Sequence, residues 1–167
     1  IIESNHKVLE VYTQPPQKRN RGQKIQNSPI HDFSKKSDIP VNCPSNIGKN
    51  EVDHIKQLKP DLVIVVAYGK ILPTDLLNLD KILFINVHAS LLPKWRGAAP
   101  MQRAIMNMDQ ETGISIMKIL PKLDAGPILM QSKIKITQEI NHQELSDKMS
   151  KLGAKLILDT ITLIKNN

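Results

Sequence analysis

Apolar residues along the chain fall into short continuous runs that alternate with stretches of helical spacing. Runs rich in β-branched residues predict strands over Leu62–Ala67 and Ile82–His88. The first of these runs has no polar position, which is typical of a parallel strand that helices cover on both faces. Further strands are expected over Val8–Tyr12, Thr112–Ile119 and Ile128–Ile136, with a short extended piece over Ile39–Val41.

Amphipathic spacing between these runs predicts the helices. Apolar residues three apart indicate a helix over Asn50–Leu58 that ends before a proline. A longer helix begins at Asn141, where Glu144 stands three residues on as the partner of a capping box. Its apolar face comprises Leu145, Met149, Leu152 and Leu156. Shorter helices are expected over Pro73–Leu79 and Ala99–Met106.

The alternation of strands and helices predicts an α/β fold with a parallel or mixed sheet. The chain has 167 residues, of which 40% are hydrophobic, so it is long and apolar enough for one domain with a core. Aromatic residues make up only 3%. Isoleucine, leucine and valine must therefore build most of that core.

A polar, basic segment over Pro16–Ser28 interrupts the pattern and is expected to be a long loop. It contains four cations of the kind that bind phosphates: Lys18, Arg19, Arg21 and Lys24. The whole chain has a net charge of +7, from 23 Lys and Arg against 16 Asp and Glu. A polyanionic partner such as nucleic acid fits this charge, but a solvated charge run and a compositional bias explain it equally well.

Composition excludes several classes of protein. The single cysteine, Cys43, rules out a disulfide framework and a multi-thiolate metal site within one chain. The longest apolar run, Leu62–Tyr68, is far shorter than the roughly 20 residues that cross a bilayer. The histidines lack the spacing of metal ligands, and we expect no metal. The chain begins with Ile1 and has no signal peptide, so we expect a soluble protein of a reducing compartment whose true start precedes Ile1.

The candidate chemistry lies at the end of the strand over Ile82–His88. Asn86 and His88 are two residues apart, so their side chains point to the same face of a sheet. An amide donor beside an imidazole suits acyl transfer, because the amide stabilises a developing oxyanion and the imidazole moves protons near neutral pH. Spacing alone favours a plainer alternative, in which both are hydrogen-bonded residues at a strand end.

Two turn-rich segments follow. Lys94–Pro100 contains Trp95 and Arg96 beside a glycine, which suits an anion or a base but is as common in a surface loop. Asp124, between two expected strands, is either a carboxylate partner for His88 or a turn residue that bonds its own backbone. Gly69 and Lys70 do not form a phosphate loop, because the upstream glycine and the following Ser or Thr are absent.

Taken together, these segments resemble the methionyl-tRNA formyltransferases, a branch of the folate-dependent formyltransferases. The run from Asn86 to Pro93 is similar to the signature of that family, and the segment from Leu123 to Leu129 is similar to the one that holds its aspartate. The resemblance implies a Rossmann-like, mostly parallel sheet flanked by helices. It also implies that Asn86, His88 and Asp124 are the catalytic trio.

The resemblance extends to the substrates. It implies 10-formyltetrahydrofolate as the formyl donor, bound by Ala67, Tyr68, Gly69, Ile71 and Leu72 and by Ser90, Leu91, Leu92 and Pro93. Two features are similar to the tRNA branch, namely Trp95–Pro100 and the basic segment, which departs from the family pattern at Pro16–Asn20. The implied partner is initiator methionyl-tRNA, bound by Lys18, Arg19, Arg21, Lys24 and Arg96.

The resemblance also implies what surrounds this chain. The family begins with a β-strand that precedes Ile1 and carries a C-terminal β-barrel domain beyond Asn167. We therefore expect residues 1–167 to form one catalytic domain cut short at both ends, without the family's first strand. Losing a central strand leaves backbone groups unpaired, so we expect the isolated chain to be poorly stable. The full-length protein is expected to be a monomer of the bacterial cytoplasm or an organelle matrix.

The implied activity is transfer of the formyl group to the α-amine of methionyl initiator tRNA. In this hypothesis Asn86 and a protonated His88 stabilise the oxyanion, and Asp124 orients His88 and helps remove the amine proton. Two alternatives remain open at this stage. One is a folate-dependent formyltransferase that acts on a sugar nucleotide, and the other is a catalytically dead RNA-binding module.

Overall fold

The computed structural model describes residues 1–19, 24–137 and 139–166, and it has the α/β class that the sequence predicts. Two compact units make up the chain, and each is described by itself. One comprises Ile1–Pro60 with Tyr68–Leu79, and the other comprises Asp61–Ala67 with Asp80–Asn167. The second unit holds the strand that ends in Asn86 and His88.

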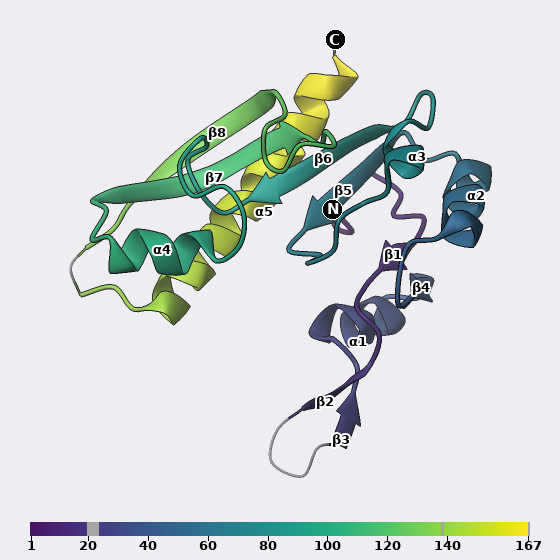
Figure 1. The fold of residues 1–167 in the computed structure, drawn as a ribbon, viewed down its shortest axis with the longest axis horizontal. Helices are drawn as coiled ribbons and strands as arrows, with labels where there is room; N and C mark the ends of the chain where they lie inside the picture. The colour runs from purple at the N-terminus through teal and green to yellow at the C-terminus, as the bar shows by residue number, and fades with distance from the viewer. Residues whose placement is uncertain (20–23, 138, 167) are drawn as a thin grey trace. The chain divides into compact units, whose positions relative to one another are not determined.

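A four-stranded mixed sheet is the frame of the second unit (Figure 1). Its strands are β5 (Leu62–Val66), β6 (Leu83–His88), β7 (Glu111–Lys118) and β8 (Ile128–Lys135), in the order β5-β6-β7-β8. The pair β5 and β6 is parallel, as the apolar run of β5 predicts, but β5 is only partly buried and Val66 is 60% exposed, so the expectation of cover on both faces is wrong. The pairs β6 with β7 and β7 with β8 are antiparallel. A short link joins β7 to β8, and such a link returns the chain in the opposite direction.

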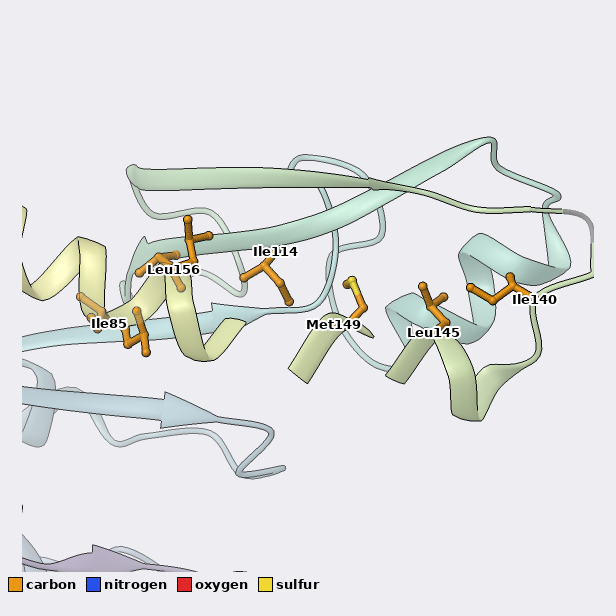
Figure 2. Close-up of a cluster of buried hydrophobic side chains, with 8 residues drawn as sticks. Ile85, Ile114, Ile140, Leu145, Met149 and Leu156 are labelled. Atoms are coloured by element: carbon orange, nitrogen blue, oxygen red, sulfur yellow. The ribbon is translucent and has the colours of Figure 1, made fainter. Parts of the chain in front are cut away.

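The long helix α5 (His142–Lys165) covers one face of this sheet, with β7 and β8 as its main contacts. Asn141 caps it through the expected capping box, since its side chain accepts from the Glu144 backbone and Glu144 accepts from the Asn141 backbone. Figure 2 shows the core between helix and strands, which is almost entirely aliphatic. Its buried members are Ile85, Ile114, Ile116, Ile140, Leu145, Met149, Leu156 and Ile157.

The core determines which way the polar residues of β6 point. Ile85 is in the core under α5, and Val87 packs against that core. Side chains alternate along a strand, so Asn86 and His88 point to the opposite face of the sheet. The helix α4 (Pro100–Met106) contacts α5 and β7, in agreement with the helix expected over Ala99–Met106.

The first unit contains a parallel pair of two-residue strands, β1 (Val11–Tyr12) and β4 (Val41–Asn42). Its helices include α2 (Lys49–Leu58) and the short α3 (Thr74–Leu77), both expected from the sequence. A further helix, α1 (Pro29–Lys36), was not expected. Its signals were local, because Ser28 accepts a hydrogen bond from the His31 backbone as N-cap and proline follows at the first helical position.

The expectation of a loop throughout the basic segment is wrong in part. Residues Gln17–Arg19 form β2 and Lys24–Gln26 form β3, an antiparallel pair in which Lys18 faces Ile25. Positions 20–23 lie outside the described residues. Backbone pairing between two exposed strands needs no apolar alternation, so the polar composition did not reveal this hairpin. None of the helices in the described part of the chain is long and apolar enough to cross a membrane.

Candidate active site

The candidate site begins on β6, on the sheet face opposite α5. His88 pairs in register with Ser115 of β7, and Ser115 pairs with Gln131 of β8. Directly opposed residues share one face, so these three polar side chains form a row across the sheet. Asn86 is two residues back on the same face, opposite Met117. His88 is 6% exposed and Asn86 is partly exposed.

Each ring nitrogen of His88 faces an oxygen atom. Nε2 lies 3.0 Å from the Trp95 carbonyl oxygen, and Nδ1 lies 3.7 Å from Asp124 Oδ2. A carbonyl oxygen has no proton to donate, so the Trp95 contact is a hydrogen bond only when Nε2 carries the hydrogen. The nitrogen without a hydrogen in the neutral ring is then Nδ1, which faces the carboxylate.

The Asp124 carboxylate is held in place by the neighbouring loop. Its Oδ2 accepts a hydrogen bond of 2.7 Å from the Gly97 backbone N–H, and the residue is buried, with 9% exposed. Its backbone has a φ of 44°, in the left-handed region that non-glycine residues rarely adopt. Local packing after Asp124 is tight, because a Cβ on Gly126 would lie 1.8 Å from the Lys118 carbonyl oxygen. Because its carboxylate accepts from Gly97, the alternative in which Asp124 is only a turn residue that bonds its own backbone does not describe these contacts.

This arrangement can support proton transfer and stabilisation of negative charge. The Trp95 carbonyl accepts a hydrogen only from Nε2 of His88, and the Asp124 carboxylate lies beside the other ring nitrogen. Asn86 adds a neutral amide on the same face of β6. Groups of these kinds move protons and stabilise the oxyanion in acyl-transfer reactions.

The segment Ser90–Pro93 continues from β6 and is held by a buried hydroxyl. Ser115 Oγ donates to the Ser90 carbonyl at 2.6 Å and accepts from the Leu92 backbone N–H at 3.0 Å. Gln131 Nε2 donates to the same Oγ and to the Leu92 carbonyl. The backbone of Leu92 is thus satisfied within the protein. Ser90 and Leu92 are buried, whereas Leu91 is partly exposed and Pro93 is exposed.

The second candidate folate segment follows β5. Ala67 belongs to the second unit, and Tyr68, Gly69, Ile71 and Leu72 belong to the first. Within the first unit, Gln14 Nε2 donates to the Tyr68 carbonyl at 2.6 Å, and Gly69 adopts a φ of 75°. Ile71 is 88% exposed. The segment lies outside helices and strands, so most of its backbone polar groups are not committed to a ladder.

The basic residues are divided between the two units. Lys18 lies on β2 and Lys24 on β3, both exposed on the hairpin of the first unit. Arg19 ends β2, and Arg21 lies outside the described residues. Arg96 is exposed in the second unit, beside the Gly97 that binds Asp124.

Sequence reasoning missed the groups that support the trio. The Trp95 carbonyl and the Gly97 N–H are backbone atoms, which no residue pattern identifies. Asp109 and Ser115 were missed as well, although both are polar residues whose side chains are buried. A single polar position inside the apolar run of β7 was the available signal for Ser115. Among residues 1–19, 24–137 and 139–166, no group of three or more His, Cys, Asp or Glu could hold a metal ion.

Known proteins with similar sequences bear the name methionyl-tRNA formyltransferase. The methionyl-tRNA formyltransferase of Pelagibacter ubique is 51% identical over 163 residues, which is 96% of this chain and 53% of that protein. The methionyl-tRNA formyltransferase of Sulfurihydrogenibium sp. is 47% identical over 167 residues, which is 99% of this chain and 54% of that protein. The chain thus spans about half the length of these relatives.

Solved structures support the fold. The crystal structure of phosphoribosylglycinamide formyltransferase from Bacillus halodurans superposes with a TM-score of 0.80 at 23% identity, covering 96% of this chain and 81% of that one. The sequence pattern of the family described as formyl transferase matches residues 2–161, nearly the whole chain. With its mixed sheet and its buried His88–Asp124 pair, the chain belongs to the formyl transferase family.

Proposed function

We propose that this protein transfers the formyl group of 10-formyltetrahydrofolate to the α-amine of methionyl initiator tRNA. The observation that carries the proposal is the His88–Asp124 pair, buried beside Asn86 on one face of β6. The names of the relatives at 51% and 47% identity support methionyl-tRNA as the acceptor. The catalytic residues of the proposal are Asn86, His88 and Asp124.

The three residues stabilise negative charge and accept a proton. Asn86 and the protonated ring of His88 stabilise the negative charge that develops on the formyl oxygen when the amine attacks. Asp124 stabilises the protonated imidazole across the 3.7 Å to Nδ1 and accepts the proton that the amine loses, directly or through water. The bond between the formyl carbon and the folate nitrogen then breaks, and this nitrogen takes up a proton and leaves as tetrahydrofolate. The Gly97 N–H keeps Oδ2 aimed at the ring.

The candidate folate residues of each unit, taken separately, offer groups suited to a flat heterocycle with hydrogen-bonding edges. Tyr68, Gly69, Ile71 and Leu72 offer backbone groups outside any strand, together with the exposed Ile71 side chain, and Ala67 precedes them. Leu91 is partly exposed and Pro93 is exposed, so these members of the segment can contact the donor. Ser90 and Leu92 are buried, and their backbone groups bond to Ser115. The donor supplies the electrophilic formyl carbon, and the protein supplies position and a water-poor environment.

The basic hairpin binds the RNA backbone in this proposal. Lys18 and Lys24 extend from paired strands, and Arg19 and Arg21 belong to the same segment. Arg96 adds a cation next to the loop that carries the trio's support. Contacts of this kind supply affinity without reading bases. The whole protein works as a monomer in a bacterial cytoplasm or an organelle matrix.

The test is a formyl-transfer assay with the full-length protein, 10-formyltetrahydrofolate and methionyl initiator tRNA. We expect turnover, and we expect His88→Ala to lower kcat/KM by about a hundredfold or more, since general acid-base groups contribute on that order. Lys133→Ala is the matched control. Lys133 is exposed on β8 and pairs with the exposed Glu111, so its removal should leave turnover unchanged.

Acceptor specificity separates this proposal from its rivals. An enzyme that formylates an amino sugar nucleotide but not methionyl-tRNA would overturn the choice of acceptor. A folded protein that binds tRNA and shows no formyl transfer to either acceptor would instead be an RNA-binding module. Turnover that survives His88→Ala would remove the catalytic role of the trio while leaving the acceptor assignment intact.

A further inference from the structure

Trp95 is held at three points around a backbone that its side chain disfavours. Its φ is 58°, in the left-handed region that bulky residues rarely adopt. The preceding peptide is held by Ser90 Oγ, which donates to the Lys94 carbonyl at 2.6 Å. The Trp95 carbonyl accepts from His88 Nε2, and the indole Nε1 donates to Asp109 Oδ2 at 2.7 Å.

Asp109 is a fixed anchor for this indole. Its side chain is only 6% exposed, and its backbone N–H donates to the Ala104 carbonyl of α4 at 2.9 Å. Its second oxygen, Oδ1, accepts from Asn107 Nδ2 at 2.7 Å, and Lys94 Nζ lies 3.8 Å from it. Neither Trp95 nor Asp109 belongs to the trio, and both lie in the same unit as His88.

We infer that Asp109 and Trp95 are positioning residues for His88. The Trp95 carbonyl accepts the Nε2 hydrogen, which fixes the orientation of the ring in both its protonated and its neutral form and keeps the hydrogen of the neutral ring on Nε2. The inference rests on the proposed formyl transfer for its catalytic consequence. A strained backbone persists only where its surroundings hold it. Releasing the indole from Asp109 therefore lets the Trp95 peptide relax, which withdraws the carbonyl from Nε2. The Nδ1 tautomer then becomes available, and its hydrogen faces Asp124 Oδ2.

Two variants break the anchor from opposite sides. Trp95→Phe removes the indole donor and keeps an aromatic ring, whereas Asp109→Leu removes the acceptor. We expect each variant to lower kcat about tenfold, because the reacting groups are misplaced. KM for the folate donor and for the tRNA should stay within about twofold, because the residues that bind the substrates are unchanged. The double variant should be no worse than the poorer single one, since both remove the same contact.

A conservative variant distinguishes geometry from charge. Asp109→Asn keeps one oxygen for the Trp95 indole, and its new NH₂ group can face Asn107, whose exposed amide can turn to present an oxygen. We expect it to retain kcat within about twofold of the parent protein. Lys133→Ala, on the exposed surface of β8, serves again as the control for general sensitivity.

The ring-nitrogen chemical shifts of His88, measured by NMR above the titration range of histidine, give a readout that does not depend on turnover. We expect an Nε2-protonated ring in the parent protein, in Asp109→Asn and in Lys133→Ala, and a growing share of the Nδ1 tautomer in Trp95→Phe and Asp109→Leu. This tautomer shift should occur even if the protein formylates another acceptor. The experiment therefore tests the role of Trp95 and Asp109 independently of the proposed acceptor.

Two results would overturn the inference. One is an unchanged His88 tautomer and an unchanged kcat in Trp95→Phe, which retains the aromatic packing and is expected to fold even if Asp109→Leu does not. The other is an Asp109→Asn variant as impaired as Asp109→Leu, because that outcome would assign the effect to the charge of Asp109 and not to its hold on Trp95. Thermal unfolding of each variant establishes that it is folded.

Discussion

The Gly97 N–H donates to Asp124 Oδ2, the same carboxylate oxygen that lies 3.7 Å from His88 Nδ1. One oxygen atom therefore joins a loop backbone to the imidazole of β6. The bond to Gly97 directs this oxygen at the ring and leaves Oδ1 for other partners. Position 97 suits this role because its φ of 86° is one that glycine adopts without strain.

Asp124→Asn should separate the charge of this residue from its shape. Asparagine keeps an oxygen that can accept from the Gly97 N–H, so we expect the variant to fold and to bind the folate donor. The negative charge beside Nδ1 of His88 is lost, and on the proposed mechanism we expect kcat to fall by about a hundredfold or more. Formylation kinetics and a folate-binding titration measure the two quantities. Unimpaired turnover would remove Asp124 from the proposed mechanism.

Gly126→Ala should destabilise the loop that carries Asp124. The new Cβ would lie 1.8 Å from the Lys118 carbonyl oxygen, so the backbone has to move. We expect a loss of about 2–4 kcal/mol of unfolding free energy, as for other severe overpacking. Gly153→Ala on α5 is the matched control, because its Cβ would meet Val87 at an ordinary 3.5 Å. It should gain about 0.5–1 kcal/mol from helix propensity. Equal effects in denaturant unfolding would contradict this account.

Most elements were predictable because each strand and helix carries its own periodic signal. The apolar run of β5, the capping box of α5 and the helical spacing of α2 are local features, and the structure confirms all three. The helix α1 was missed because it follows the basic segment and has few apolar positions. The β2–β3 hairpin was missed because exposed backbone pairing leaves no apolar pattern.

Ser115→Ala should lower the free energy of unfolding although it removes a single oxygen. That hydroxyl serves the Ser90 carbonyl, the Leu92 N–H and Gln131 Nε2, and its loss leaves buried polar groups without a partner. We expect about 1–3 kcal/mol of destabilisation. Ser150→Ala, on the exposed surface of α5 where Oγ donates to Asp147, should change stability by less than about 0.5 kcal/mol. Chemical denaturation of both variants makes the comparison, and similar losses would count against the buried network.

Asp109 should contribute to the loss of unfolding free energy as the pH is lowered. Burial by itself raises the pKa of this carboxyl, but hydrogen bonds from Trp95 and Asn107, with the Lys94 ammonium, outweigh it and hold the pKa below its ordinary value of 3.8. A depressed folded-state pKa means that this stabilisation is present above 3.8 and is lost as pH falls through the folded value. Asp109→Asn should therefore lose less stability than the parent protein on acidification below pH 3.8. Parallel acid-unfolding curves would contradict this.

Lys18→Ala and Lys24→Ala test the basic hairpin. Each variant should weaken tRNA binding whatever the tRNA sequence, and each should reduce the slope of log affinity against log salt by about one unit. Lys148→Ala is the control, since Lys148 is an exposed cation on α5. A salt series of binding titrations gives the slopes. An unchanged slope in both hairpin variants would leave the hairpin out of the RNA contact.

The candidate site was predictable in part for a physical reason. Asn86 and His88 share a face because of strand alternation, which sequence spacing reveals directly. Asp124 is far along the chain and reaches His88 through the loop between β7 and β8, so the residues alone left two alternatives for it, and the resemblance to a family favoured the partner of His88. The partners of both residues are backbone atoms of Trp95 and Gly97, which carry no sequence signature.

At position 124 the residue that best suits the left-handed backbone differs from the residue that the proposed chemistry needs. Asparagine tolerates a φ of 44° at least as well as aspartate does, and it spares the fold a buried negative charge. A laboratory selection for heat resistance alone would therefore be expected to enrich asparagine at position 124 and to yield sturdier, inactive proteins. In the proposed mechanism the aspartate at this position serves turnover, so thermostabilisation of this protein should leave that position untouched.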